Sequence, residues 1–201
     1  MKTIRFIRHA ESEANAGLPS YDPVAIPLTE SGRIAATESA VMYGRPPELI
    51  VVSPYLRARQ TAEPFIALFS EAKVEEWPIH EFTYISPARC RGSTATGRRP
   101  MVEEYWRLAS PTYVDGQGAE SFLHFIRRVQ ATLNELRDRR ERTILAVGHG
   151  LFIKAAKFFQ SHAIKPSDPD SMRMFWEYSE KHPVPNLGTW DVPRGGNEHA
   201  V

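Results

Sequence analysis

The sequence predicts an α/β protein, a three-layer α/β/α sandwich whose central sheet is mostly parallel. Two continuous apolar runs, residues 49–53 and 143–147, have the composition of parallel strands that are covered on both faces. Around them lie stretches with apolar residues at helical spacing, of which residues 119–140 are the clearest. Strands and helices that alternate in this way are typical of a sheet with helices on both sides. At 201 residues the chain is long enough for one well-buried domain and short for two.

The first predicted strand covers residues 2–7 and ends at the charged pair Arg8-His9. After a loop of prolines and small residues, Thr29 is a suitable N-cap for a helix over residues 30–43. In open α/β sheets ligands bind at the carboxyl ends of the strands. His9 therefore stands where chemistry is expected.

The second predicted strand, residues 49–53, ends at Pro54 and leads into a helix over residues 55–69. Arg57 falls in the first turn of that helix, where a cation opposes the helix dipole. Such a placement has a cost, and a functional role for Arg57 would explain it. A third strand is predicted at residues 73–77, with a less regular apolar pattern.

Residues 83–118 are the part of the chain least like a compact core. The segment is rich in Gly, Ser, Thr and Pro and is predicted to be a long loop with one short helix at residues 101–109. Long loops in compact domains are usually functional or mobile, so we interpret this one as a lid-like insertion. Its arginines form either a solvated surface or a set of donors to an anionic substrate, and the second alternative makes Arg98 and Arg99 substrate-binding candidates.

The helix predicted over residues 119–140 carries an apolar stripe and an opposite face of charges. We expect that charged face, which includes Arg128 and Arg139, to be solvated. The strand at residues 143–147 then delivers His149 to the same edge of the sheet as His9.

The remaining predicted elements are two helices and an edge strand, at residues 151–161, 169–181 and 187–192. Pro193 ends the strand, which a central position in a sheet would not tolerate. We assign residues 1–193 to a single domain and the polar residues 194–201 to a flexible tail. Trp176 and its neighbours on the last helix leave a homodimer open as an alternative to a monomer.

Bulk properties exclude several classes of partner. The formal net charge is +1, so no global field attracts nucleic acid or a membrane surface. The single cysteine, Cys90, cannot form an internal disulfide, which is consistent with a reducing compartment. No stretch approaches the ~20 apolar residues that a membrane-spanning helix needs, and the N-terminus lacks the apolar core of a signal peptide. The expectation is a soluble cytoplasmic protein.

The predicted sheet gathers two histidines and two arginines at one edge: His9, His149, Arg8 and Arg57. Arginine cannot ligate a metal and its fixed charge repels a divalent cation, so no metal is expected. Guanidinium groups match phosphate oxygens with paired hydrogen bonds, which makes phosphate the natural occupant. Transfer of a phosphoryl group to a neutral histidine is mostly positioning plus electrostatics and needs no cofactor.

The chain resembles the histidine phosphatase superfamily, which includes cofactor-dependent phosphoglycerate mutase, in three motifs that occur in the family's order: Arg8-His9-Ala10-Glu11-Ser12 with Asn15, Ser53-Pro54-x-x-Arg57-Ala58-x-x-Thr61, and Gly148-His149-Gly150. The resemblance runs from Met1 to about Phe158. It implies a phosphoglycerate mutase-like fold and a transfer in which the phosphoryl group moves first to His9 and then to water or another hydroxyl.

The same resemblance implies roles for the other motif residues. It places the phosphate among Arg8, Arg57 and His149, with Asn15 as a neighbour and Ser53 behind them. Glu81 matches the family's catalytic acid, which would protonate the leaving group and later activate water. The Gly-rich turn that follows this acid in the family is missing here, so a surface carboxylate remains the alternative.

Three functions stay open at this stage. The first is a phosphomonoesterase that transfers the phosphoryl group to water, and the second is a mutase that returns it to a phosphorylated acid. The third is a non-catalytic domain that binds a phosphorylated ligand. The expected partner is a small phosphorylated substrate or a phosphoprotein, because one fold of this kind serves many substrates.

Overall fold

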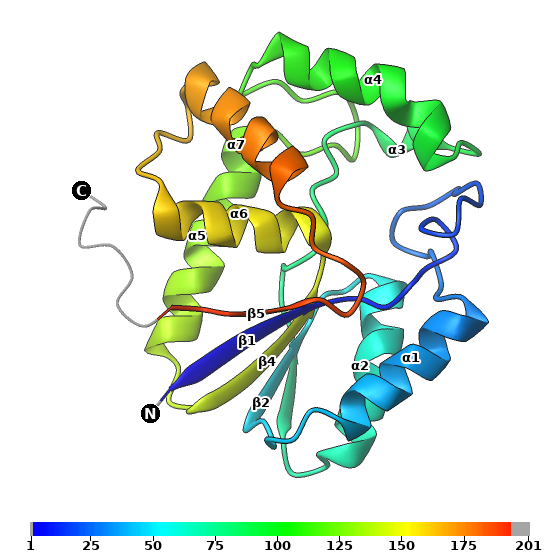
Figure 1. Ribbon diagram of the computed structural model, residues 1–201. Helices are drawn as coiled ribbons and strands as arrows, with labels where there is room; N and C mark the ends of the chain where they lie inside the picture. The colour runs from blue at the N-terminus through cyan, green and yellow to red at the C-terminus, as the bar shows by residue number, and fades with distance from the viewer. Residues whose placement is uncertain (1, 194–201) are drawn as a thin grey trace.

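The computed structural model describes residues 2–193, and its centre is a five-stranded sheet (Figure 1). The strands lie in the order β3-β2-β4-β1-β5. Their bounds are β1 (Thr3–Arg8), β2 (Leu49–Val52), β3 (Lys73–Glu76), β4 (Thr143–Gly148) and β5 (Thr189–Asp191). All neighbours pair in parallel except β5, which runs antiparallel to β1 at the edge. The predicted mostly parallel sheet and the predicted edge strand are confirmed.

Helices cover both faces of this sheet, which confirms the three-layer α/β/α class (Figure 1). Helices α1 (Glu30–Val41) and α2 (Leu56–Leu68) pack on one face, and α5 (Phe122–Asp138), α6 (Gly150–Ser161) and α7 (Pro169–Lys181) lie on the other. Strands β2 and β4 are buried along their whole length because their side chains point alternately into the two layers. Ile50 and Leu145, for example, pack against α2, whereas Leu49 and Ile144 face the opposite core.

Helix α1 begins where the sequence predicts and ends two residues early. The Thr29 hydroxyl accepts a hydrogen bond from the Gly32 backbone N–H at 3.0 Å, as an N-cap does. A Cβ at Gly32 would lie 2.2 Å from the Glu11 carbonyl oxygen, so only glycine lets α1 pack this closely on the segment after β1. This contact fixes the course of the chain directly after Arg8 and His9.

The segment 83–118 is more regular than its composition predicts. It contains α3 (Pro87–Cys90) and α4 (Ala95–Leu108), and α4 begins six residues before the predicted short helix. The Thr94 hydroxyl accepts from the Gly97 N–H and caps α4 at 3.1 Å. The other end is held by aromatic packing, since the rings of Trp106 and Trp176 stack with centroids 4.7 Å apart. Trp176 is partly buried by this packing, and the homodimer stays a prediction.

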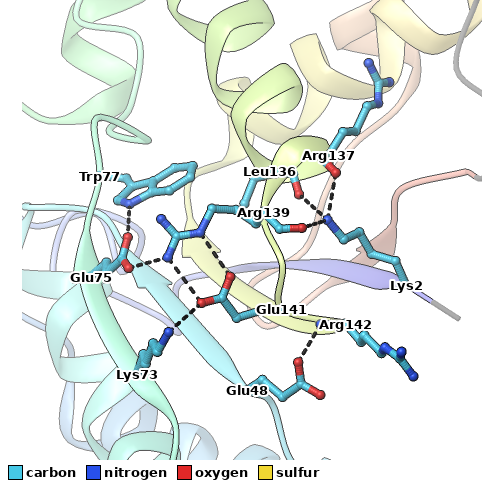
Figure 2. Close-up of polar contacts among 10 residues, drawn as sticks. All are labelled: Lys2, Glu48, Lys73, Glu75, Trp77, Leu136, Arg137, Arg139, Glu141 and Arg142. Carbon is cyan, nitrogen blue, oxygen red and sulfur yellow. Dashed lines mark hydrogen bonds and ion pairs between the residues drawn. The ribbon is translucent and has the colours of Figure 1, made fainter.

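The charged face of α5 is not solvated as a whole, and the prediction was wrong for Arg128 and Arg139. The Arg128 side chain is only 12% exposed and forms a bidentate ion pair with Glu120. Arg139 ion-pairs with Glu75 of β3 and with Glu141 (Figure 2). Segments distant in the sequence cover these positions, which helical periodicity alone does not reveal.

Figure 2 shows that the network around Arg139 joins β3 to the turn between α5 and β4. Glu141 also accepts from Lys73 at 3.0 Å, and Trp77 donates its indole N–H to Glu75 at 2.9 Å. The network lies at the start of β4, at the end of the sheet opposite to His9. Its role is structural support.

Within residues 2–193 no helix has the length and apolar content that crossing a bilayer requires. The predicted tail, residues 194–201, lies outside the described residues.

Candidate functional site

The two histidines lie side by side where β1 and β4 end. Arg8 is in register with Gly148, so the residues that follow, His9 and His149, leave neighbouring parallel strands at the same edge. Their ring centroids are 5.1 Å apart. His149 is fully buried and His9 is 3% exposed, so both lie where water screens charge weakly.

The surroundings of His9 determine which ring nitrogen carries the proton. Its Nδ1 lies 2.7 Å from the Ala10 carbonyl oxygen, which can only accept, so Nδ1 bears the hydrogen. Nε2 is then unprotonated and accepts from Arg57 Nε at 3.2 Å. Burial, followed by the charge of Arg57, holds the pKa of His9 well below its usual 6.5. At neutral pH His9 therefore presents a free lone pair on Nε2.

Two arginines near His9 have N–H groups that form no hydrogen bond within the described residues. Arg57 donates through Nη1 to the Pro23 carbonyl at 2.7 Å, and burial lowers its pKa to about 10. Arg8 donates through Nη1 to the Val184 carbonyl at 2.6 Å, while its buried Nε has no partner among the described residues. Within residues 2–193 neither guanidinium forms a salt bridge with a carboxylate, and both line one cavity with His9. Unneutralised cations of this kind favour an anionic ligand.

His149 is held from behind by Ser53, as the motif predicts. Ser53 Oγ lies 2.8 Å from His149 Nε2 and accepts a weak bond from the Tyr55 backbone N–H at 3.3 Å. The serine hydroxyl can then donate to Nε2, which places the ring proton on Nδ1. That Nδ1 is buried and has no partner in the described part of the chain. His149 is fully buried, and it is not among the residues that line the cavity beside His9.

Glu81 enters the same cavity from the segment after β3. Its Oε1 accepts from the backbone N–H groups of Phe82 at 3.1 Å and Leu151 at 3.0 Å. Leu151 lies in the first turn of α6, so the carboxylate is fixed at a helix N-terminus, a favourable place for negative charge. Its Oε2 has no hydrogen bond within the described residues. The surface-carboxylate alternative for Glu81 does not fit this position.

Asn15 lies at the mouth of the cavity with its amide oriented by two neighbours. Its Oδ1 accepts from the Ser12 hydroxyl at 2.9 Å and from Asn186 Nδ2 at 3.1 Å. The amide nitrogen of Asn15 is left as a donor for a ligand. Asn186 also donates to the His9 carbonyl at 2.9 Å and so ties the segment before β5 to the catalytic loop.

The chain matches the family model of the histidine phosphatase superfamily, branch 1, over residues 4–185. It belongs to this superfamily. No curated protein sequence matches it. The match covers all three motifs, and the phosphoglycerate mutase-like resemblance is confirmed.

Solved structures share the fold at low sequence identity. A mycobacterial glucosyl-3-phosphoglycerate phosphatase with bound VO3 is 21% identical, with a TM-score of 0.70 over 95% of this chain and 90% of that one. A putative α-ribazole-5′-P phosphatase from Escherichia coli is 19% identical, with a TM-score of 0.71 over 100% and 98% of the two chains. A phosphoserine phosphatase from Entamoeba histolytica with 3-phosphoglyceric acid is 22% identical, with a TM-score of 0.67 over 95% and 90%.

In this member of the superfamily the site opens into a cavity of about 230 Å³. Helices α3 and α4 and the loop after β1 supply its outer wall, and Arg98 and Cys90 lie in that wall. Burial raises the pKa of the Cys90 thiol, so the neighbouring arginines do not make it a thiolate at neutral pH. Residues 2–193 contain no cluster of three or more His, Cys, Asp or Glu that could hold a metal ion.

The structure separates the two arginines that the sequence pairs as substrate-binding candidates. Arg98 lines the cavity, but Arg99 is outside it: its side chain is 78% exposed and pairs with Glu103, one turn along α4. Adjacent residues on a helix point about 100° apart, so only one of them can face the site. The structure therefore does not bring Arg99 to the cavity.

Sequence reasoning missed three contributors to the site. Tyr55 packs edge-on against His149 and its ring lies 5.0 Å below the Arg57 guanidinium. Its place directly after the Ser53-Pro54 motif was the available signal. Asn186 and Arg128 gave no local signal, because their partners are far away in the sequence. Arg128 donates to the Pro78 and His80 carbonyls and so holds the backbone just before Glu81.

Proposed function

We propose that this protein is a metal-independent phosphomonoesterase that works through a phosphohistidine on His9. The observation that carries the proposal is the unprotonated Nε2 of His9, held beside Arg57 in a cavity that also contains Arg8. A low pKa keeps this nitrogen nucleophilic at neutral pH. The same two cations that lower the pKa also attract the phosphate.

In the first step Nε2 attacks phosphorus and the bond from phosphorus to the leaving oxygen breaks. Arg57 releases Nε2 and, with Arg8, donates to the equatorial oxygens, which carry the charge of the transition state. His149 adds the Nδ1 proton that has no protein partner, and Asn15 adds its amide N–H. Removal of one such donor typically costs about 10²–10³ in rate.

Glu81 acts first as the general acid and then as the general base. A protonated Oε2 gives its proton to the departing oxygen, so the alcohol leaves neutral. The carboxylate then accepts a proton from the water that attacks phosphohistidine, and this restores His9 and releases inorganic phosphate. The contact of Oε1 with the N–H of Leu151 keeps the carboxyl group in place through both steps.

Water is the proposed acceptor rather than a second phosphorylated acid. The composition of residues 83–118 favours a flexible lid that admits water, but the segment folds into α3 and α4, so lid flexibility no longer supports this choice. Support comes from the solved structures with this fold, three of which carry the names of phosphatases. A binding-only role is disfavoured because the nucleophile, its cations and the acid are all in place.

The experiment is a chemical quench with ³²P-labelled 4-nitrophenyl phosphate after exhaustive chelation of metals. We expect protein-bound label that is acid-labile and base-stable in the wild type and absent in His9→Ala. His124→Ala is the matched control, because His124 is exposed on α5, and its label should equal that of the wild type. Full turnover in His9→Ala, or activity that needs added zinc or magnesium, would contradict the proposed mechanism.

A second assay decides between hydrolysis and mutase activity. The protein is incubated with 3-phosphoglycerate, with and without a bisphosphorylated primer, while free phosphate and isomerisation are followed together. We expect phosphate release without dependence on the primer. Rapid isomerisation that depends on the primer would replace the phosphatase by a mutase with the same His9 chemistry.

A further inference from the structure

The cavity has a chemically different outer half. Its inner end holds the phosphoryl site at His9, and its outer wall is formed by residues 13–27 and by the region 82–102. The total of about 230 Å³ is below the roughly 300–1,000 Å³ of sites for drug-sized ligands. Because the phosphate occupies part of this space, only a compact part of the leaving group fits inside the cavity.

Part of the outer wall is apolar and aromatic, beside polar residues such as Ser20, Asp22 and Thr83. Ile26, Phe82, Tyr84, Ile85 and Val102 all line it. The aromatic part is rigid, since the Phe82 and Tyr84 rings lie 5.1 Å apart and pack on the aromatic cluster beneath α4. Hydroxyl groups of a sugar or glycerol would lose hydrogen bonds to water against such a wall, and a ring or branched chain would not.

Arg98 is the one cation of this outer wall within the described residues. Its Nη1 donates to the Ser93 carbonyl at 2.8 Å and to Ser20 Oγ at 3.1 Å. These bonds fix the guanidinium between the loop after β1 and the start of α4. All of its hydrogen bonds in the structure use Nη1, so Nη2 and Nε keep free donors. Asp22 also lines the wall, and its Oδ1 accepts from the Val24 N–H at 2.8 Å.

We propose that the outer half selects phosphomonoesters whose leaving group has a compact apolar body, aromatic or branched, and a carboxylate that pairs with Arg98. This inference rests on the phosphatase function proposed above. A guanidinium that is already oriented loses little entropy when it binds a carboxylate. The apolar wall strengthens the pair by keeping water away from it. Polyol phosphates and bulky phosphorylated ligands are disfavoured.

The test compares phenyl phosphate, its 3- and 4-carboxy derivatives, its 4-aminomethyl derivative and glycerol phosphate as substrates. In the wild type we expect the better carboxy isomer to exceed phenyl phosphate in kcat/KM, and glycerol phosphate to be poorest. Arg98→Gln should lower kcat/KM for the carboxy substrate about 10- to 100-fold, the worth of a hydrogen bond to a charged group. For phenyl phosphate, kcat/KM should change by no more than about twofold. A general disturbance of residues 83–118 would instead lower kcat/KM for both substrates.

Arg99→Gln is the matched control and should leave every substrate unchanged, because Arg99 points away from the cavity. Equal losses on carboxy and unsubstituted substrates in Arg98→Gln would overturn the proposal. So would the same selective loss in Arg99→Gln. A preference for the aminomethyl derivative would also overturn it and point to Asp22 instead.

A binding measurement separates this inference from the phosphatase function. Calorimetry of the wild type compares benzylphosphonate with its carboxy derivatives, which cannot be hydrolysed. Because all of these ligands share the phosphonate, the difference in their affinities reports the outer half. Tighter binding of a carboxy derivative, lost in Arg98→Gln, supports the inference even if no phosphoester is turned over. No difference in affinity between the phosphonates would overturn it, whatever the activity.

Discussion

Arg57 performs two tasks at His9, and the substitution Arg57→Gln separates them. The variant removes the Nε donor that lies 3.2 Å from His9 Nε2 and the positive charge that faces the phosphate. Loss of one donor to transition-state charge costs about 2.7–4 kcal/mol, so kcat/KM at neutral pH should fall about 10²- to 10³-fold. The neighbouring Arg8 keeps the fall from being larger.

The second task is electrostatic and changes the pH profile. Burial is the largest cause of the low pKa of His9, and the charge of Arg57 is the next. Without that charge the pKa of His9 rises towards its usual 6.5, although burial keeps it below this value. Because the neutral imidazole is the nucleophile, activity falls as the pH drops through this pKa. The variant should therefore lose activity at a higher pH than the wild type.

The assay measures initial rates of 4-nitrophenyl phosphate hydrolysis for both proteins between about pH 4.5 and 8, around the usual histidine pKa. The ratio of variant to wild type cancels the ionisation of the substrate. We expect a constant ratio at neutral pH and a further fall on the acid side. Arg59→Gln is the control, because Arg59 lies on the same helix and pairs with Glu76 at the surface.

A ratio that does not change with pH would refute the electrostatic role of Arg57, even if the rate fell by the expected factor. An NMR titration of the His9 ring in the two proteins gives the same comparison without turnover. An unchanged His9 titration in Arg57→Gln would leave burial, with the smaller effect of the Arg8 charge, as the cause of the low pKa.

Three further substitutions test other parts of the structure. Ser53→Ala removes the partner of His149 Nε2 and should lower kcat/KM about tenfold through a wrongly oriented ring. Because the buried nitrogen is left unpaired, the melting temperature should fall as well. Arg128→Lys loses the bonds that hold the backbone before Glu81, so hydrolysis of an alkyl phosphate, which needs the acid, should fall about tenfold more than that of 4-nitrophenyl phosphate. Hydrogen bonds, chiefly from Arg139, lower the pKa of Glu141 from 4.5 to about 2, and Glu141→Gln should cost about 1–2 kcal/mol of unfolding free energy in urea at neutral pH, after allowance for solvent screening. Since this stability is complete above about pH 4.5 and is lost as the pH falls towards 2, the difference from the wild type should shrink over that range; a constant difference would refute the assignment.

The core of the site was predictable because it depends on strand ends. Parallel strands bring their carboxyl ends to one edge of the sheet. The residues directly after these strands therefore lie close together, and the sequences of the intervening helices do not affect this. His9 and His149 follow this rule, and Arg57 follows it in the first turn of the helix after β2. Ser53 lies on the same edge, and the structure places it 2.8 Å from His149. For His9, His149 and Arg57 a local pattern and a simple topology indicated the position, whereas the role of Ser53 came from the resemblance to the family.

The lid and the supporting contacts were less predictable because tertiary contacts decide them. The Gly, Ser and Pro content of the residues before Met101 predicts a loop. In the structure Thr94 caps α4 and Trp106 packs on α7, and these contacts stabilise a helix of low intrinsic propensity. Arg128 occupies a position that periodicity assigns to solvent. The backbone of residues 78–80 covers it, and no pattern within α5 contains that information.

The distribution of charge in the site explains how one set of residues can both bind phosphate and attack it. Arg8 and Arg57 direct their hydrogen bonds to carbonyl groups and to His9, so no carboxylate within the described residues neutralises them by an ion pair. Glu81 is instead fixed by backbone N–H groups at the start of α6. Had Glu81 formed an ion pair with either arginine, the phosphate would have to break that pair to bind. Because backbone N–H groups hold the carboxyl group instead, the remaining donors of both arginines stay available to the substrate.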